Sequence, residues 1–156
     1  MKNTVIFDLD GTLALIEKRR IKAGKSADGK ETKKMDWDVF HDPSNIHLDE
    51  PNIPIIKMAQ MFAEDGFTII IFSGRSDKTK FTTRSWLSNN RIPFQKLIMR
   101  DSKTNHFTPD DILKKDMLDK FADINDVFLV VDDSNKVVKM WRSLGLTVFQ
   151  VADGNF

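Results

Sequence analysis

The sequence predicts an α/β fold, in the form of a Rossmann-like, doubly wound parallel sheet. Three short and continuous apolar runs carry this prediction, because a strand buried on both faces of a parallel sheet reads as an uninterrupted β-branched and aromatic run. The runs lie at Val5–Phe7, Thr68–Phe72 and Phe128–Val131. Segments of helical spacing separate them, and this alternation indicates a parallel sheet with right-handed crossovers.

Weaker signals complete the order of elements. Two further strands are expected, at Lys96–Met99 and Thr147–Val151. Helices are expected at 53–64, at 78–89, from Pro109 onward and at 134–144. The first and last of these are followed by a glycine, which is a common helix stop. Thr108 is the expected cap of the third, with Pro109 in its first position.

The segment from Leu15 to Asp49 interrupts this alternation with much charge and no strong period. A compact domain rarely carries so long an irregular connection without a reason. We interpret the segment as a small flap or cap inserted after the first strand of a single domain that spans residues 1–156. Because it follows that strand directly, it should leave from the edge of the sheet where the strand ends.

Composition narrows the possible classes of protein. The chain has 156 residues, 40% hydrophobic and 30% charged, which fits one soluble domain with a sizeable core. Cysteine is absent, which excludes a thiol nucleophile and cysteine-ligated metal centres. No apolar run approaches the roughly 20 residues of a membrane span. The apolar run near the N-terminus is too short for a signal peptide, so we expect a cytoplasmic protein.

Polar side chains follow the three strong strands where each one ends. Asp8 and Asp10 follow the first, Ser73 the second, and Asp132 and Asp133 the third. Ligand sites in such sheets lie beyond the carboxyl ends of the strands, so we place the active site there. Acids that converge in this way repel one another unless a cation lies among them. Oxygen ligands without cysteine favour Mg²⁺.

The motifs at these strand ends resemble those of the haloacid dehalogenase-like (HAD) phosphohydrolases. Phe7-Asp8-Leu9-Asp10-Gly11-Thr12-Leu13 is similar to the first motif of that family, and Ser73-Gly74-Arg75 to the second. A helical lysine, Lys114 or Lys115, and the segment Val131-Asp132-Asp133 follow in the order of the family. The resemblance covers the chain except for the flap, and it implies the HAD-like version of the fold.

The resemblance implies a role for each of these residues. Asp8 is the expected nucleophile that forms an aspartyl-phosphate, and Asp10 the expected general acid and base. Ser73 and the lysine are expected to contact the phosphoryl group. Mg²⁺ would be held by Asp8, by the backbone carbonyl of Asp10, and by Asp132 or Asp133, between which the sequence does not decide. Further phosphate or substrate contacts are expected from Thr12, Gly74, Arg75 and Asp110, and the basic residues Arg19 and Arg20 of the flap are expected to add to them.

One branch of the family is most similar. The segments 137–145 and 150–156 resemble the C-terminal end of phage polynucleotide kinase–phosphatase, which is a 3′-phosphatase domain. The pattern Asp110-Asp111-Ile112-Leu113-Lys114 matches as well and favours Lys114 over Lys115. The chain departs from this branch in its loop at 100–107, in its longer and more basic flap, and in having no GxxxxGK[ST] loop for a kinase half.

The flap carries a charge signal of its own. Residues 18–34 hold eight basic and two acidic residues, a net charge of +6 in a chain of net charge +1. A basic arm beside the active site can neutralise the phosphates of a polynucleotide. Trp37 and Phe40 follow this run and could stack on bases, or could pack the flap onto the domain.

The sequence therefore predicts an Mg²⁺-dependent phosphomonoesterase that acts on polynucleotide 3′-phosphates. Two alternatives remain open: a 5′(3′)-nucleotidase or other small-metabolite phosphatase with the flap as a lid, and a catalytically silent relative that binds nucleic acid. The expected partner is a phosphorylated nucleic-acid end or a nucleotide, and no membrane. A phosphoacceptor receiver is excluded, because receivers carry the acid pair after the first strand and here it comes late.

Overall fold

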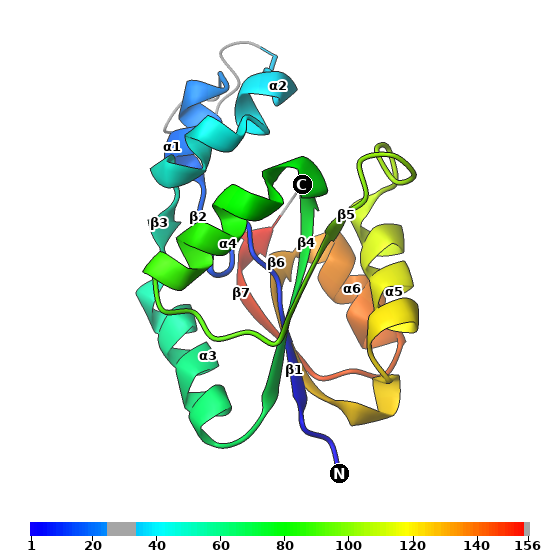
Figure 1. Cartoon of the computed structure of the whole chain (residues 1–156). Coiled ribbons are helices and arrows are strands. Elements are labelled where there is room, and N and C mark those ends of the chain that lie inside the picture. The colour runs from blue at the N-terminus through cyan, green and yellow to red at the C-terminus, as the bar shows by residue number, and fades with distance from the viewer. Residues whose placement is uncertain (25–33, 155–156) are drawn as a thin grey trace.

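The centre of the computed structural model, which describes residues 1–24 and 34–154, is a five-stranded parallel sheet of order β5-β4-β1-β6-β7 (Figure 1). Its strands are β1 (Thr4–Phe7), β4 (Thr68–Ser76), β5 (Lys96–Arg100), β6 (Val127–Ser134) and β7 (Val148–Gly154). All four pairings are parallel. The sheet confirms the predicted fold class, including the two weaker strands.

Helices cover both faces of this sheet, with α3 (Ile53–Glu64) and α4 (Lys80–Asn89) on one side and α5 (Asp110–Phe121) and α6 (Asn135–Ser143) on the other (Figure 1). Residues of β1 alternate between the two cores: Val5 and Phe7 pack on the first side, and Ile6 packs on the second. Burial on both faces explains why the central strands are continuously apolar. Within the described part of the chain, no helix is long and apolar enough to span a membrane.

The start of α5 differs from the expectation by one position. Pro109 is the N-cap residue, with an extended ψ of 146°, and the helix begins at Asp110. Thr108 does not cap this helix, because its hydroxyl donates to the side chain of Asn105. The predicted cap was therefore wrong, although the helix itself is confirmed.

The flap contains more regular structure than its sequence suggests. It contains α1 (Glu17–Lys22), α2 (Trp37–Phe40) and the 3₁₀ helix η1 (Pro43–Leu48), and the short strands β2 (Ala14–Leu15) and β3 (Glu50–Pro51) stand at its two ends. β2 and β3 pair antiparallel, so the segment leaves and re-enters the domain at one place. Its helices lie above the carboxyl end of β1, as expected (Figure 1). The basic residues Lys25, Lys30 and Lys33 lie outside the described residues.

Candidate active site

Three carboxylates meet where β1 and β6 end. The backbone N–H of Asp8 donates to Val131 at 2.9 Å, and Asp132 and Asp133 come next in β6. Each carboxylate offers one oxygen that lies within 4.8 Å of the others, and all three residues are buried. The parallel register that pairs Phe7 with Val131 thus brings together the two acidic motifs that lie far apart in the sequence.

Lys114 completes this cluster. Its Nζ donates to Asp8 Oδ1 at 2.6 Å and to Asp132 Oδ2 at 2.8 Å, and the side chain is buried. Burial alone would lower the pKa of Lys114, but the charges of Asp132 and Asp8 outweigh it and raise this pKa. Lys115 instead pairs with Asp119 on the surface at 2.7 Å. Of the two candidate lysines, the structure brings Lys114 to the site.

The positive charge of Lys114 does not fully offset the repulsion among the acids. Burial raises the pKa of Asp8 well above its usual value, Lys114 opposes this shift, and Asp132 and Asp133 add to it. Burial and the neighbouring Asp132 raise the pKa of Asp133 to about 6. A divalent cation would relieve this repulsion, and a donor set made only of carboxylate oxygens fits Mg²⁺.

The turn after β1 holds these carboxylates in place. Thr12 donates its hydroxyl to Asp8 Oδ2 at 2.9 Å and is fully buried, so it orients the expected nucleophile from beneath the cavity. Gly11 has φ +84°, and a Cβ there would lie 2.0 Å from Asp133 Oδ2. Glycine is therefore required both by the left-handed backbone and by the close approach of Asp133.

A second buried cluster surrounds Asp10. Arg75 donates from Nε to Asp10 Oδ1 at 2.8 Å, and Arg19 donates from Nη2 to the same oxygen at 2.9 Å. Both arginines also donate to Asp49, which is 4% exposed. Arg19 comes from α1 and Asp49 from the end of the flap, so this cluster ties the flap to the loop that carries the expected general acid.

The two arginines decide the charge of Asp10. Burial alone would raise the pKa of Asp10, but the charges and hydrogen bonds of Arg75 and Arg19 lower it to about 2. In this arrangement Asp10 is a carboxylate at neutral pH. Arg75 and Arg19 are both almost fully buried, so neither is a mobile surface cation.

The end of β4 supplies the second wall. Ser73 is buried, and its Oγ accepts the N–H of Arg75 at 3.1 Å, which leaves its own hydroxyl proton to donate. A Cβ on Gly74 would lie 2.8 Å from Asp110 Oδ1, so this glycine admits the Asp110 carboxylate. Arg100 binds Asp110 and also donates from Nε to the carbonyl of Gly74 at 2.9 Å.

Several residues that support the site were not among the site residues expected from the sequence. The indole of Trp141 donates to Asp132 Oδ2 at 3.3 Å from a fully buried position. Asp49 joins the Asp10 cluster from a region without periodicity. His41 and His106, which belong to none of the motifs identified in the sequence, both line the cavity described next.

A cavity of about 780 Å³ opens above the acid cluster. Its lining includes the following predicted site residues: Asp8, Asp10, Arg20, Gly74, Arg75, Asp110, Lys114 and Asp133. The other predicted residues, Thr12, Arg19, Ser73 and Asp132, are buried around it and are not among its described lining.

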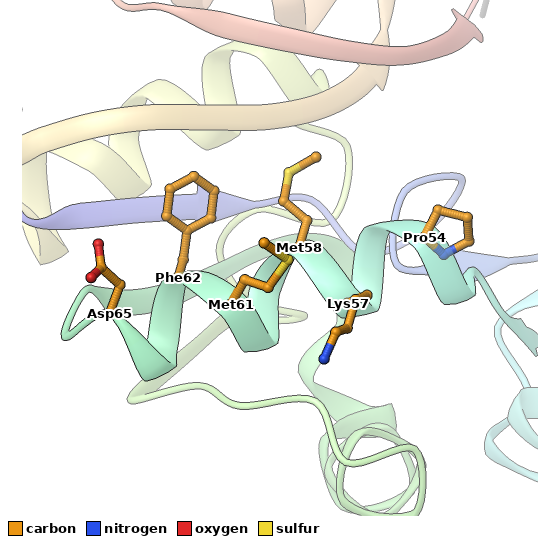
Figure 2. Close-up of a pocket in the computed structure, with 6 residues that line it drawn as sticks. All are labelled: Pro54, Lys57, Met58, Met61, Phe62 and Asp65. Atoms are coloured by element: carbon orange, nitrogen blue, oxygen red, sulfur yellow. The ribbon is translucent and has the colours of Figure 1, made fainter.

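A second hollow, of about 510 Å³, lies along α3. Figure 2 shows its lining from that helix and its end, with Met58 and Phe62 directed toward the sheet. Its ionisable groups are Lys57 and Asp65 alone among the described residues, so it offers no cluster comparable to the acids.

Comparison with known proteins places these features in a family. The family model for the polynucleotide kinase PNKP phosphatase domain matches residues 2–156. A chain in a solved Pnkp1/Rnl/Hen1 complex is 32% identical with a TM-score of 0.77, and covers 100% of this chain and 48% of its own length. A chain in a Pnkp1/Rnl/Hen1 RNA repair complex gives 32% identity and a TM-score of 0.76, over 98% and 43% of the two chains. The chain thus spans about half the length of these relatives or less.

More distant structures share the fold. A protein described as a haloacid dehalogenase-like hydrolase from Bacteroides fragilis has 19% identity and a TM-score of 0.70, over 100% of this chain and 90% of its own. The match to the family model over nearly the whole sequence goes further than fold, and it agrees with the order of the motifs at the strand ends. The chain therefore belongs to the polynucleotide kinase PNKP phosphatase domain family of HAD-type phosphatases.

Proposed function

We propose that this chain is an Mg²⁺-dependent phosphomonoesterase that removes 3′-phosphates from polynucleotide ends through an aspartyl-phosphate intermediate. The observation that carries the proposal is the position of Asp8, held between Lys114 and Thr12 at the floor of a cavity large enough for more than a phosphate. Membership in the PNKP phosphatase family supports the choice of substrate.

In the first step, a carboxylate oxygen of Asp8 attacks phosphorus. A bond forms between Asp8 and phosphorus, the bond from phosphorus to the 3′-oxygen breaks, and Asp10 gives that oxygen a proton. Asp10 must carry a proton for this step, although Arg75 and Arg19 favour its carboxylate form. A substrate phosphate that takes over hydrogen bonds from Arg75 would weaken this preference, because it competes for the same guanidinium.

In the second step, water attacks phosphorus and the bond to Asp8 breaks, which releases inorganic phosphate. Asp10 takes the proton from this water, in the carboxylate form that the two arginines stabilise. The Asp8 carboxylate then returns to its hydrogen bonds with Lys114 and Thr12.

Fixed positive charge is needed because a carboxylate and a phosphate dianion repel each other. Lys114 supplies one such charge beside Asp8, and the hydroxyl of Ser73 can donate to a phosphoryl oxygen. Bound Mg²⁺ would add charge neutralisation and alignment of nucleophile and phosphate.

The contacts of Asp132 and Asp133 favour different roles for these two residues. Asp132 accepts hydrogen bonds from Lys114, from Trp141 and from the N–H of Ser134, so both of its oxygens are engaged. Asp133 faces the cavity beside Asp8. We therefore assign the direct metal contacts to Asp8, Asp133 and the backbone carbonyl of Asp10, and we assign to Asp132 the orientation of Lys114.

This assignment predicts different metal titrations for two isosteric variants. Asp133→Asn should raise the Mg²⁺ concentration for half-maximal activity by roughly 100-fold or more, because it loses a direct ligand. Asp132→Asn should shift it by only about 10-fold, the lower end of the range for an outer partner, and should mainly lower kcat. Activity and calorimetric binding measured against Mg²⁺ check both values. A larger affinity loss in Asp132→Asn would reverse the assignment, and unchanged turnover after chelation would remove the metal from the mechanism.

Two observations support a polynucleotide as the substrate. The 32% identical relatives are chains of Pnkp1/Rnl/Hen1 complexes, one of which is described as an RNA repair complex. The cavity that holds Asp8 also has Arg20 and Lys78 in its lining, which suits a ligand with more than one phosphate. RNA is the substrate that the second relative suggests.

A substrate panel with Mg²⁺ tests the function. Oligoribonucleotides and oligodeoxyribonucleotides with a 3′-phosphate should be hydrolysed with a kcat/KM at least about 100-fold above that of the 5′-phosphorylated strands, mononucleotides and sugar phosphates. Phosphate release gives the rates. Preference for mononucleotides or sugar phosphates would favour a small-metabolite phosphatase, and binding of oligonucleotides without any hydrolysis would indicate a silent relative.

A further inference from the structure

The cavity above Asp8 is bounded by aromatic side chains from two separate segments. Trp37, Phe40 and His41 line it from α2 and the residue that follows, and His106 and Phe107 line it from the loop between β5 and α5. A volume of about 780 Å³ is typical of a site for an organic ligand, and the reacting phosphate would fill only part of it. The remaining space lies between the flap and this loop.

The Trp37 ring packs on two neighbouring aromatic side chains and is otherwise exposed. Its indole stacks on His41 at a centroid distance of 5.8 Å and 20°, and meets the edge of Phe40 at 5.7 Å. Phe40 is 7% exposed, and the guanidinium of Arg19 lies 4.3 Å from its ring centroid, so Phe40 packs the flap onto the domain. Trp37 itself is 56% exposed.

Phe107 is exposed on a loop that is fixed at its base. Its ring is 91% exposed and contacts His106 at a centroid distance of 4.5 Å. Nη1 of Arg100 donates to the carbonyls of Asn105 and Thr108 at 2.6 Å each, so the chain on both sides of Phe107 is held. Phe107 thus presents an exposed ring at the cavity, on a stretch of chain that is held on both sides.

The two aromatic segments line the same cavity. Burial lowers the pKa of His41, Asp10 opposes this shift, and the charges of Arg19, Arg100 and His106 add to it. His41 of the flap is thus close enough to Arg100 at the end of β5 and to His106 of the loop for their charges to act on it. His41 Nδ1 is buried and has no hydrogen-bond partner among the described residues.

We propose that Trp37 and Phe107 form a subsite that binds the terminal nucleobase beside the 3′-phosphate. This inference rests on the proposed function and names the part of the substrate that the cavity recognises. A planar base matches the aromatic surfaces, and the cationic groups of Arg20 and Lys78 in the same lining suit the phosphates attached to it. Every base has a π face, so such a subsite would read the presence of a base without choosing its sequence.

The test compares two 3′-phosphorylated oligonucleotides, one with an ordinary terminal base and one that ends in a tetrahydrofuran abasic nucleotide. Trp37→Ala and Phe107→Ala should each lower kcat/KM on the base-bearing strand by roughly 10-fold to 100-fold, the range expected from stacking on one base. On the abasic strand, both variants should differ from wild type by less than about 3-fold, because the interaction they lose is already absent. Trp37→Phe should recover most of the loss.

Phe81→Ala is the matched control, since Phe81 is 82% exposed on α4 and is not among the described lining of the cavity. It should leave kcat/KM unchanged on both strands. Equal losses of Trp37→Ala and Phe107→Ala on the two strands would overturn the base subsite, as would unchanged rates on both. A wild-type chain that hydrolyses glycerol 2-phosphate but neither oligonucleotide would instead overturn the proposed function.

Discussion

Lys114→Met is expected to lower both the activity and the stability of this chain. Lys114 is buried and donates to Asp8 and Asp132, with Asp133 close by. Without Lys114, and in the absence of Mg²⁺, three buried carboxylates share a small space with no lysine to balance them. Breaking such a buried pair costs about 3–5 kcal/mol in the free energy of unfolding, which urea denaturation measures. The loss of a fixed charge beside the phosphoryl group should lower kcat by roughly 100-fold to 1,000-fold.

Lys115→Met is the matched control for this prediction. The two lysines are neighbours in α5, but Lys115 pairs with Asp119 on the surface of the helix. An exposed pair of this kind contributes about 0.5 kcal/mol or less, so both stability and kcat should stay close to wild type. If Lys115→Met lost activity while Lys114→Met retained it, the assignment of the site lysine would be wrong.

The sheet and the acid cluster could be predicted from the sequence because both depend on local patterns. The run Val5–Phe7 is buried on both faces of the sheet, and its composition shows this directly. Asp8 and Asp133 could be placed together because parallel strands end at one edge, whatever their separation in the chain. The choice of Lys114 over Lys115 needed more than chemistry, since both lie in the same turn of a helix.

The flap could not be predicted to the same extent. Its helices α1 and α2 have six and four residues, too few for a hydrophobic period to be recognised. Asp49 is 30 positions from Arg19 and 26 from Arg75, and a pairing over such distances leaves no pattern in the sequence. Arg19 was expected to meet the substrate, whereas the structure places it between Asp10 and Asp49, beneath the cavity lining.

The Asp10 cluster also links the flap, with its proposed base contact, to the expected general acid. Arg19 joins α1 to both Asp10 and Asp49, and its guanidinium also supports Phe40 under Trp37. The flap segment that carries the proposed base contact is thus anchored on the same group that fixes the expected general acid. Substrate contacts with the flap and substrate contacts with Asp10 therefore both act on the same buried charges, those of Arg19, Asp10 and Asp49.

Asp8→Asn is expected to abolish phosphate release while the fold stays intact. Asparagine has the shape of aspartate, and its carbonyl oxygen can still accept from Lys114, while the hydroxyl of Thr12 can rotate to accept from the new amide. Lys114 also keeps Asp132 as its partner, and the repulsion among the acids falls, so stability should change by about 1 kcal/mol or less. The amide is not a nucleophile, so kcat should fall by roughly 10,000-fold or more. Rapid-quench mass spectrometry should detect a chain carrying one phosphoryl group in wild type and none in the variant.

Asp119→Asn, on the surface of α5, should behave as wild type in both measurements. An Asp8→Asn variant that folds and retains a tenth of the wild-type rate would exclude Asp8 as the group that carries the phosphoryl intermediate.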